Sequence, residues 1–198
     1  PHSASEVGRL ARALDESAAA IEDRENRLAN ANRALKVLSA GNRTLLGGHD
    51  EQALLDQMCK AIVEAGGFRI AWIGYALPDK HVQLMASCGA EPGLLDKLQV
   101  TWDDSDTGRG PVGRAIREGT LQVWSSRSEL PEDAVWKAGA LARGCHATIS
   151  MPVILGGTNI GVLTICAAEQ DIFDPAVIEV LAEAARDLAL GIRVARAE

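Results

Sequence analysis

The stretch ATISMPVILGGTNIGVLTICAA, residues 147–168, decides the fold class. Its two halves, 147–155 and 160–168, are rich in β-branched and aliphatic residues, and the turn sequence GGTN at 156–159 separates them. Apolar runs of this length on either side of a short glycine-containing turn are typical of a β-hairpin. We therefore predict two antiparallel strands joined by this turn.

A second hairpin is predicted upstream. FRIAWIGYAL at 68–77 is aromatic and β-branched, the turn PDK follows, and HVQLMASCG at 81–89 forms the returning run. Strand alternation gives the first run two faces, one with Phe68, Ile70 and Trp72 and the other with Ala71, Ile73 and Tyr75. LQVWSS at 121–126 adds a short strand. A sheet built from hairpins is antiparallel, so these runs predict an α+β fold and argue against a doubly wound nucleotide-binding fold.

Helix start and stop signals place helices around these strands. Asp50 is a capping residue before a segment with apolar residues at helical spacing, and Gly66-Gly67 ends that segment. The predicted helices of the domain are 51–65, a short one from Pro92 through Leu98, 108–118, 132–143, and a terminal one opened by Asp174-Pro175.

The N-terminal segment has the pattern of a coiled coil. Residues 5–46 contain no proline, and their apolar residues recur at alternating spacings of 3 and 4 for nearly six heptads. Ser17, Arg24 and Asn42 interrupt the repeat, and polar residues at such positions set register at a cost in stability. The alternative is a single amphipathic helix packed on its own domain. The predicted dimer seam is Val7, Leu10, Leu14, Ile21, Leu28, Leu35 and Leu38.

GRGPVG at 108–113 reads as G-x-G-x-x-G, the spacing of a phosphate-binding loop. Such a loop must follow a buried strand, whereas this one follows TWDDSDT, whose three carboxylates would repel a phosphate. Pro111 suits the first turn of a helix, and Gly119 suits its end. We interpret the glycines as the start of a short helix.

Composition and charge exclude several classes of function. The chain of 198 residues has net charge −7, and residues 49–198 alone carry 13 basic and 21 acidic groups, so nucleic acid is not expected as a partner. No apolar run approaches the roughly 20 residues of a membrane span, and no signal peptide is visible. The four cysteines form no C-x-x-C pair, which argues against a zinc site and favours buried thiols.

The stretch 35–192 resembles a GAF domain, a small-molecule sensor module. The resemblance rests on AWIGYA, on SDTGRGPVGRAIREG, on the run from Gly144 to Val153, on IGVLTI, and on Phe173-Asp174 before the closing helix. It implies a central antiparallel sheet flanked by helices, with a ligand pocket beside the glycine segment. The face of the sheet that forms the pocket is left open.

The N-terminal SEVGRLARALDESAAAIEDRE resembles the second helix of a HAMP domain. This resemblance divides the chain into a HAMP helix and linker at 1–34, the GAF domain at 35–192, and the start of an outgoing signalling helix at 193–198. It implies a fragment of a bacterial membrane receptor, on the cytoplasmic side of the inner membrane. A diguanylate cyclase, phosphodiesterase or histidine kinase would then lie downstream.

The candidate pocket residues are Trp72, Trp102, Trp124, Trp136, Cys145 and His146. Indole rings stack on flat ligands, although they are also ordinary core residues. Cys145-His146 resembles the bilin-attaching pair of phytochrome-type GAF domains, but it directly abuts a strand, which is the wrong register. Haem binding through His146 or His81 is a further alternative, although a lone histidine is usually not a ligand.

Other GAF activities match the sequence poorly. The free methionine sulfoxide reductases place cysteines after the strand that corresponds to 121–126, where this chain has Arg127-Ser128-Glu129-Leu130. Of the cyclic-nucleotide pattern only Phe173-Asp174 is present. A cation site at Asp103, Asp104 and Asp106 lacks further ligands. No metal or cofactor is therefore predicted, and an unidentified small-molecule ligand is the open alternative.

Taken together, these patterns predict a non-enzymatic sensor or relay, homodimeric through its N- and C-terminal helices. A relay without any ligand and a methionine sulfoxide reductase are the alternatives.

Overall fold

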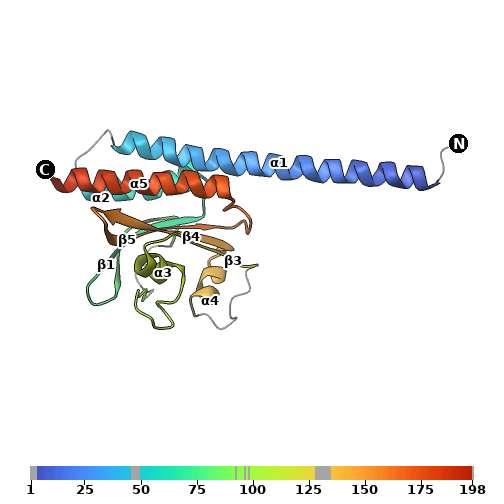
Figure 1. Ribbon diagram of the computed structural model, residues 1–198. Helices are drawn as coiled ribbons and strands as arrows, with labels where there is room; N and C mark the ends of the chain where they lie inside the picture. The colour runs from blue at the N-terminus through green and yellow to red at the C-terminus, as the bar shows by residue number, and fades with distance from the viewer. Residues whose placement is uncertain are drawn as a thin grey trace.

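A computed structural model of the chain describes residues 4–45, 50–91, 93–95, 97, 99–127 and 135–197. Three layers stack on one another, with α1, α2 and α5 on one face of a sheet and α3 and α4 on the other (Figure 1). The elements in chain order are α1 (Ala4–Leu45), α2 (Glu51–Lys60), the π-helix η1 (Ala61–Ala65), β1 (Ile70–Ala76), β2 (Val82–Cys88), α3 (Pro111–Glu118), β3 (Gln122–Ser125), α4 (Val135–Ala142), β4 (Ala147–Leu155), β5 (Thr158–Ala167) and α5 (Pro175–Ala197).

The sheet has the strand order β2-β1-β5-β4-β3, and all its pairs are antiparallel. Both predicted hairpins are confirmed, as is the α+β class. The β4–β5 turn is shorter than predicted, because Thr158 and Asn159 already pair with Leu155 and Ile154. Gly156 and Gly157 alone form the turn, with φ of 55° and 84°, the left-handed values that a two-residue hairpin turn requires.

The helix boundaries follow the expected caps. Asp50 accepts a hydrogen bond from the Gln52 amide at 3.1 Å, and Asp174 accepts one from the Val177 amide at 2.9 Å. Helix α3 begins at Pro111 and ends at Gly119. The helix expected from Pro92 is not found, because residues 93–95 and 97 form turns, while Pro92, Asp96 and Leu98 lie outside the described residues.

Two apolar clusters fill the spaces on either side of the sheet. Ala71, Ile73 and Tyr75 face the helices α1, α2 and α5, whereas Ile70 and Trp72 belong to the cluster on the α3 and α4 side. Phe68 does not share a face with Ile70, contrary to the prediction. Strand β1 starts only at Ile70, and the turn at Gly67, with φ 67°, directs Phe68 to the helix side, where it stacks on Phe173 with ring centroids 6.1 Å apart.

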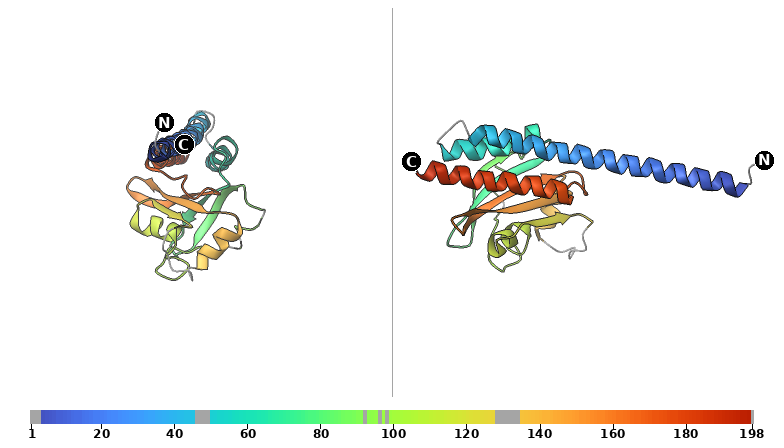
Figure 2. Two further views of the ribbon diagram at one scale, coloured as in Figure 1. Left: turned by 90° about the vertical axis from the view of Figure 1, so that its right-hand side faces the viewer. Right: turned by 45° about the horizontal axis from the view of Figure 1, so that its top comes forward.

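The predicted N-terminal helix is confirmed as α1, and its first half projects beyond the domain (Figures 1 and 2). Its second half packs on α5 and η1, with Ala34 and Val37 fully buried. Leu38 also packs partly against this core. The other predicted seam residues are each more than half exposed, namely Val7, Leu10, Leu14, Ile21, Leu28 and Leu35. No helix in the described part of the chain is long and apolar enough to span a membrane.

Candidate ligand pocket

A cavity of about 430 Å³ lies between the sheet and the layer of α3 and α4. Its floor comes from alternating positions of three strands: Ile70 and Trp72 of β1, Thr148 of β4, and Thr164 and Cys166 of β5. Its walls come from α3, α4 and the segment before them, and are lined by Leu95, Lys97, Gln99, Val100, Thr107, Gly110, Pro111, Val112, Trp136, Gly139, Ala140 and Arg143. The pocket therefore occupies the face opposite the long helices.

Two of the four predicted tryptophans line this cavity, Trp72 and Trp136. Trp124 is 1% exposed and lies behind Trp136, with the two rings edge to face at 5.2 Å and 86°. Edge-to-face packing of this kind fixes the position of the Trp136 ring. The cavity thus has one rigid aromatic wall.

Trp102 packs against the same cluster but not against the cavity. Its indole N–H donates to the Leu77 carbonyl at 3.0 Å, and the Lys80 ammonium lies 3.5 Å from its ring centroid. These contacts brace the turn between β1 and β2. We assign Trp102 a structural position beside the pocket.

Cys145 lies behind the cavity floor, in contact with Cys166, which does line the cavity. The hydrogen bond with Cys166 lowers the pKa of Cys145, although burial of the thiol acts in the opposite direction. The guanidinium groups of Arg143 and Arg69 also favour the thiolate. The same hydrogen bond and burial raise the pKa of Cys166. Both thiols are free.

His146 is outside the lining of the cavity. Its backbone N–H donates to the Ala167 carbonyl at 2.8 Å, and its carbonyl accepts from the Ser126 amide at 2.8 Å. Its ring Nδ1 is buried without a partner, as are Trp124 Nε1 and Ser126 Oγ nearby. His81 is more than half exposed beside Asp79, and neither of the two histidines that the structure describes lines the cavity.

The glycine segment is a close-packed start of α3. A Cβ on Gly108 would lie 2.1 Å from the Asp103 carbonyl oxygen, and one on Gly113 would lie 2.0 Å from that of Gly108. A Cβ on Gly110 would lie 2.9 Å from Cδ1 of Trp136. These glycines bring backbone and indole together, which supports the interpretation of GRGPVG as a packing feature.

The acidic residues before this segment are engaged within the loop. Asp103 accepts hydrogen bonds from Thr101 at 2.9 Å and from the Ser105 hydroxyl. Arg109 pairs with Asp104 at 3.2 Å and with Asp106 at 3.5 Å. Among the described residues no cluster of three or more metal-ligating side chains is found.

Sequence reasoning did not identify the polar lining of the cavity. Lys97 and Arg143 bring positive charge to it, and none of the lining residues within the described part of the chain is acidic. Thr148 and Thr164 are buried on the floor, where Thr164 contacts Ser150 through hydroxyl groups 3.1 Å apart. Hydroxyls at alternating positions inside apolar strands were the available signal for the floor.

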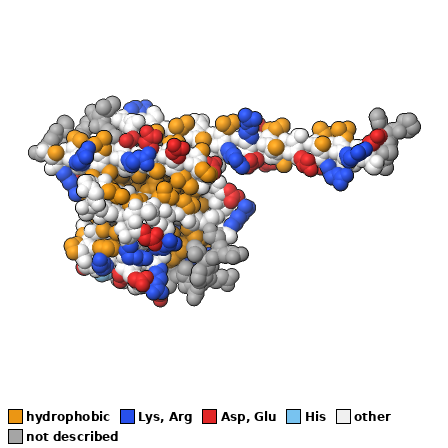
Figure 3. All heavy atoms as spheres, viewed as in Figure 1, with side chains coloured by type: hydrophobic (Ala, Val, Ile, Leu, Met, Phe, Trp, Pro, Cys, Tyr) orange, Lys and Arg blue, Asp and Glu red, His pale blue; other side chains and the backbone are white. Residues whose placement is uncertain are grey.

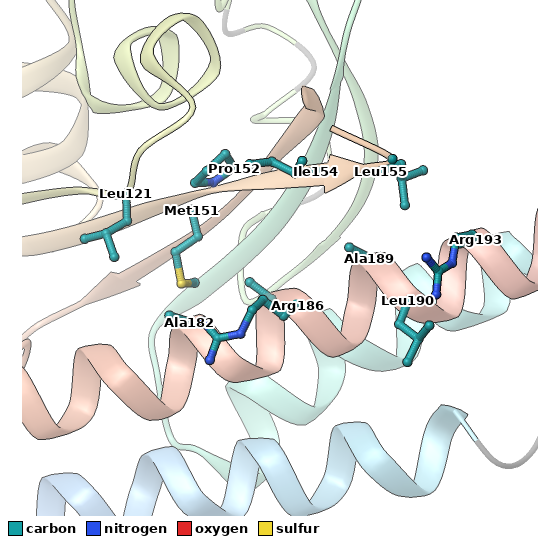
Figure 4. Close-up of a pocket in the computed structure, with 12 residues that line it drawn as sticks. Leu121, Met151, Pro152, Ile154, Leu155, Ala182, Arg186, Ala189, Leu190 and Arg193 are labelled. Carbon is teal, nitrogen blue, oxygen red and sulfur yellow. The ribbon is translucent and has the colours of Figure 1, made fainter. Parts of the chain in front are cut away.

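A second hollow lies on the opposite face, between β4 and α5 (Figure 4). It measures about 460 Å³, and Figure 3 shows hydrophobic side chains gathered between the helix layer and the sheet. Met151, Ile154 and Leu190 are among its apolar residues, and Arg186 and Arg193 are its cations. It holds no aromatic side chain, which distinguishes it from the pocket beside α3.

An antiparallel five-stranded sheet with a cavity under two short helices defines an α+β architecture. The model of the GAF domain matches residues 48–193, and the chain therefore belongs to the GAF domain family. No curated protein matches the whole sequence significantly.

Solved structures share this fold at low sequence identity. The GAF domain of a phosphoenolpyruvate-protein phosphotransferase from Coxiella burnetii has a TM-score of 0.68 at 20% identity, covering 85% of this chain and 97% of that one. Free methionine-R-sulfoxide reductase from Neisseria meningitidis, in complex with its substrate, has a TM-score of 0.67 at 20% identity, covering 83% and 90%. A domain of a putative two-component sensor histidine kinase from Sinorhizobium meliloti has a TM-score of 0.54 at 19% identity, covering 71% and 88%.

Proposed function

We propose that this chain is the sensory module of a signalling protein, in which occupancy of the pocket beside α3 and α4 is transmitted to the helices α1 and α5. One observation carries the proposal. The same strands line the pocket on one face and support the helices on the other, so that Trp72 and Ile73 are neighbours in β1 but belong to opposite clusters. A residue of β1 that moves in the pocket floor is therefore followed directly by a residue that packs against the helices.

A homodimer through α1 supplies the output of this module. The exposed residues Val7, Leu14, Ile21 and Leu28 recur every seven residues along the projecting half of α1. A second helix that covers an apolar stripe of this regularity removes it from water, which stabilises the dimer. Helix α5 adds Leu190 and Val194, which are both nearly half exposed.

Within this proposal the α1 helix continues from a HAMP domain of a bacterial membrane receptor, on the cytoplasmic side of the inner membrane. Helix α5 would lead to a diguanylate cyclase, phosphodiesterase or histidine kinase. The regular heptad spacing of α1 supports the helical input. The structural likeness to a domain of a sensor kinase agrees with a signalling role.

Disulfide crosslinking tests the dimer. Leu28→Cys, in a Cys88→Ser background, is expected to form an interchain disulfide rapidly under mild oxidation if two α1 helices pair in parallel. Asn26→Cys is the matched control, since Asn26 is exposed on α1 at the heptad position farthest from the seam. Equal crosslinking at positions 26 and 28 would contradict a defined seam.

A reductase is the second candidate, and the pair of thiols favours it. Cys166 lines the pocket, and its neighbour Cys145 has a lowered pKa, which suits a nucleophilic thiol. The test is turnover of free methionine-R-sulfoxide with a dithiol reductant, comparing the natural chain with Cys145→Ser and Cys166→Ser. Activity that both substitutions abolish would establish the enzyme, and its absence leaves the sensor.

A further inference from the structure

We propose that the pocket beside α3 and α4 selects a small aromatic carboxylate. This proposal rests on the proposed role of the pocket as a ligand site. The aromatic ring would lie against Trp136, and the carboxylate would lie at Arg143. Two features of the cavity support this assignment: its rigid aromatic wall and the positive charge of its described lining.

The aromatic wall suits a flat apolar ring. Trp136 is held from behind by Trp124 and from the side by Gly110, where even a methyl group would lie 2.9 Å from the indole. Trp72, Leu95 and Val100 add further apolar surface. A preformed slot of this kind binds planar ligands without the entropy cost of ordering the ring.

The charge of the lining is opposite to that of the domain around it. Residues 49–198 carry 13 basic and 21 acidic groups, yet the charged side chains among the described residues that line the cavity are the cations Lys97 and Arg143. Among the described residues, neither cation has an acidic group within ion-pairing distance. An unpaired guanidinium beside an apolar cavity favours an anion, and its fork matches a carboxylate in two hydrogen bonds.

Arg143 is positioned by its surroundings. Its carbonyl accepts a hydrogen bond from Nε of Arg69 at 2.5 Å, and its guanidinium lies over Gly139, where a Cβ would be only 3.2 Å from Nη1. A Cβ at this position would require the guanidinium to shift slightly. The glycine therefore leaves room for the cation beside α4.

The second hollow also has two cations, but its described lining has no aromatic side chain. Arg186 and Arg193 flank an aliphatic groove without an aromatic wall. Substitutions at these arginines therefore provide a matched control for charge.

The test is a panel of ring compounds that differ in charge, titrated calorimetrically into the natural chain: benzoate and phenylacetate, the amides benzamide and phenylacetamide, and benzylamine. The carboxylates are expected to bind at least about tenfold more tightly than their amides, because a hydrogen-bonded ion pair replaces a neutral contact. Arg143→Gln should remove most of that difference, Arg143→Lys should restore part of it, and Arg193→Gln should leave it unchanged. Thermal unfolding of each variant confirms folding.

Each of the other outcomes contradicts either the charge selection, the location of the ligand or the carboxylate site itself. Amides or benzylamine that bind as tightly as the carboxylates would contradict the charge selection but keep the pocket as a ligand site. Equal losses of carboxylate affinity in Arg143→Gln and Arg193→Gln would place the ligand in the second hollow. If no compound of any charge binds, the aromatic carboxylate assignment is wrong. The sensor function fails only if a broad set of small molecules of other chemistry also produces no thermal shift, which would leave a relay without a ligand.

Discussion

Arg196, near the end of α5, forms a two-pronged ion pair with Glu51 at the start of α2, with both N–O distances 2.8 Å. The Tyr75 hydroxyl donates to the same carboxylate at 2.5 Å, and the Arg196 guanidinium lies 5.3 Å from the Tyr75 ring centroid. Tyr75 belongs to β1, which also supplies the pocket floor. The last turns of the outgoing helix are therefore attached to a strand of the pocket.

Removing this attachment should loosen α5. Glu51→Gln is expected to lower the free energy of unfolding by about 1 kcal/mol, since the pair is two-pronged but partly exposed to solvent. Urea unfolding at pH 7 measures the change, and Glu179→Gln, at an exposed position of α5, is the control. Equal stability of the Glu51→Gln and Glu179→Gln variants would show that the attachment contributes nothing.

The same pair predicts a pH dependence. The hydrogen bond from Arg196 lowers the pKa of Glu51 below its ordinary value. The folded state thus holds this carboxylate ionised, and the associated stability is present above the unfolded pKa and is lost as the pH falls through the folded one. Between pH 7 and acidic pH, Glu51→Gln should lose less stability than the natural chain. A parallel decline in both proteins would argue against this contribution.

The glycine segment should tolerate substitution unevenly. Gly113→Ala places a methyl group 2.0 Å from the Gly108 carbonyl oxygen, and we expect it to cost on the order of 3 kcal/mol or more. Gly119→Ala meets no atom within 4 Å and should cost only about 1–2 kcal/mol, from its φ of 64°. Denaturant midpoints of the two variants compare them directly. Similar costs at both positions would contradict the close packing at Gly113.

The seam should control the oligomeric state. Leu14→Glu puts a charge into the predicted interface, and native mass spectra should shift from twice the 21.0 kDa chain mass toward the single chain. Ala19→Glu, on the opposite side of α1, should leave the dimer intact. If the natural chain is already monomeric at micromolar concentration, the proposed dimer is wrong.

Cysteine reactivity should follow burial. Cys59 is fully buried, and burial together with Cys88 and Asp56 raises its pKa. Iodoacetamide at pH 8 should therefore modify the half-buried Cys88 in the folded chain and reach Cys59 only after unfolding. Peptide mass spectrometry assigns the sites, with Cys88→Ser as the control for the first product. Early labelling of Cys59 would indicate that α2 opens readily.

Local patterns predicted most of the fold. The alternation in β1 assigned Trp72 and Ile73 to opposite faces, and Gly156 and Gly157 marked the hairpin turn. Alternation failed at Phe68, because the left-handed turn at Gly67 precedes the strand and reverses the expected direction. A period of two holds only where the backbone is already extended.

The candidate site was less predictable. The structure places Trp72 and Trp136 in the lining of the cavity, but Lys97 and Arg143 lie in irregular segments where no repeat relates their positions to the sheet. Their approach to one cavity depends on how the chain from β2 to α3 and the chain after α4 fold over the floor. Tertiary packing sets this arrangement, and a single sequence does not encode it as a local pattern.

Hydrogen exchange of the natural chain, with benzoate and with benzamide as the control, tests most directly whether the pocket communicates with the helices. Benzoate is expected to slow exchange in β1 and α4 and also to change exchange in α5 and in the second half of α1, whereas benzamide should do neither. Protection that stays within the pocket and leaves α1 and α5 unchanged would contradict this communication.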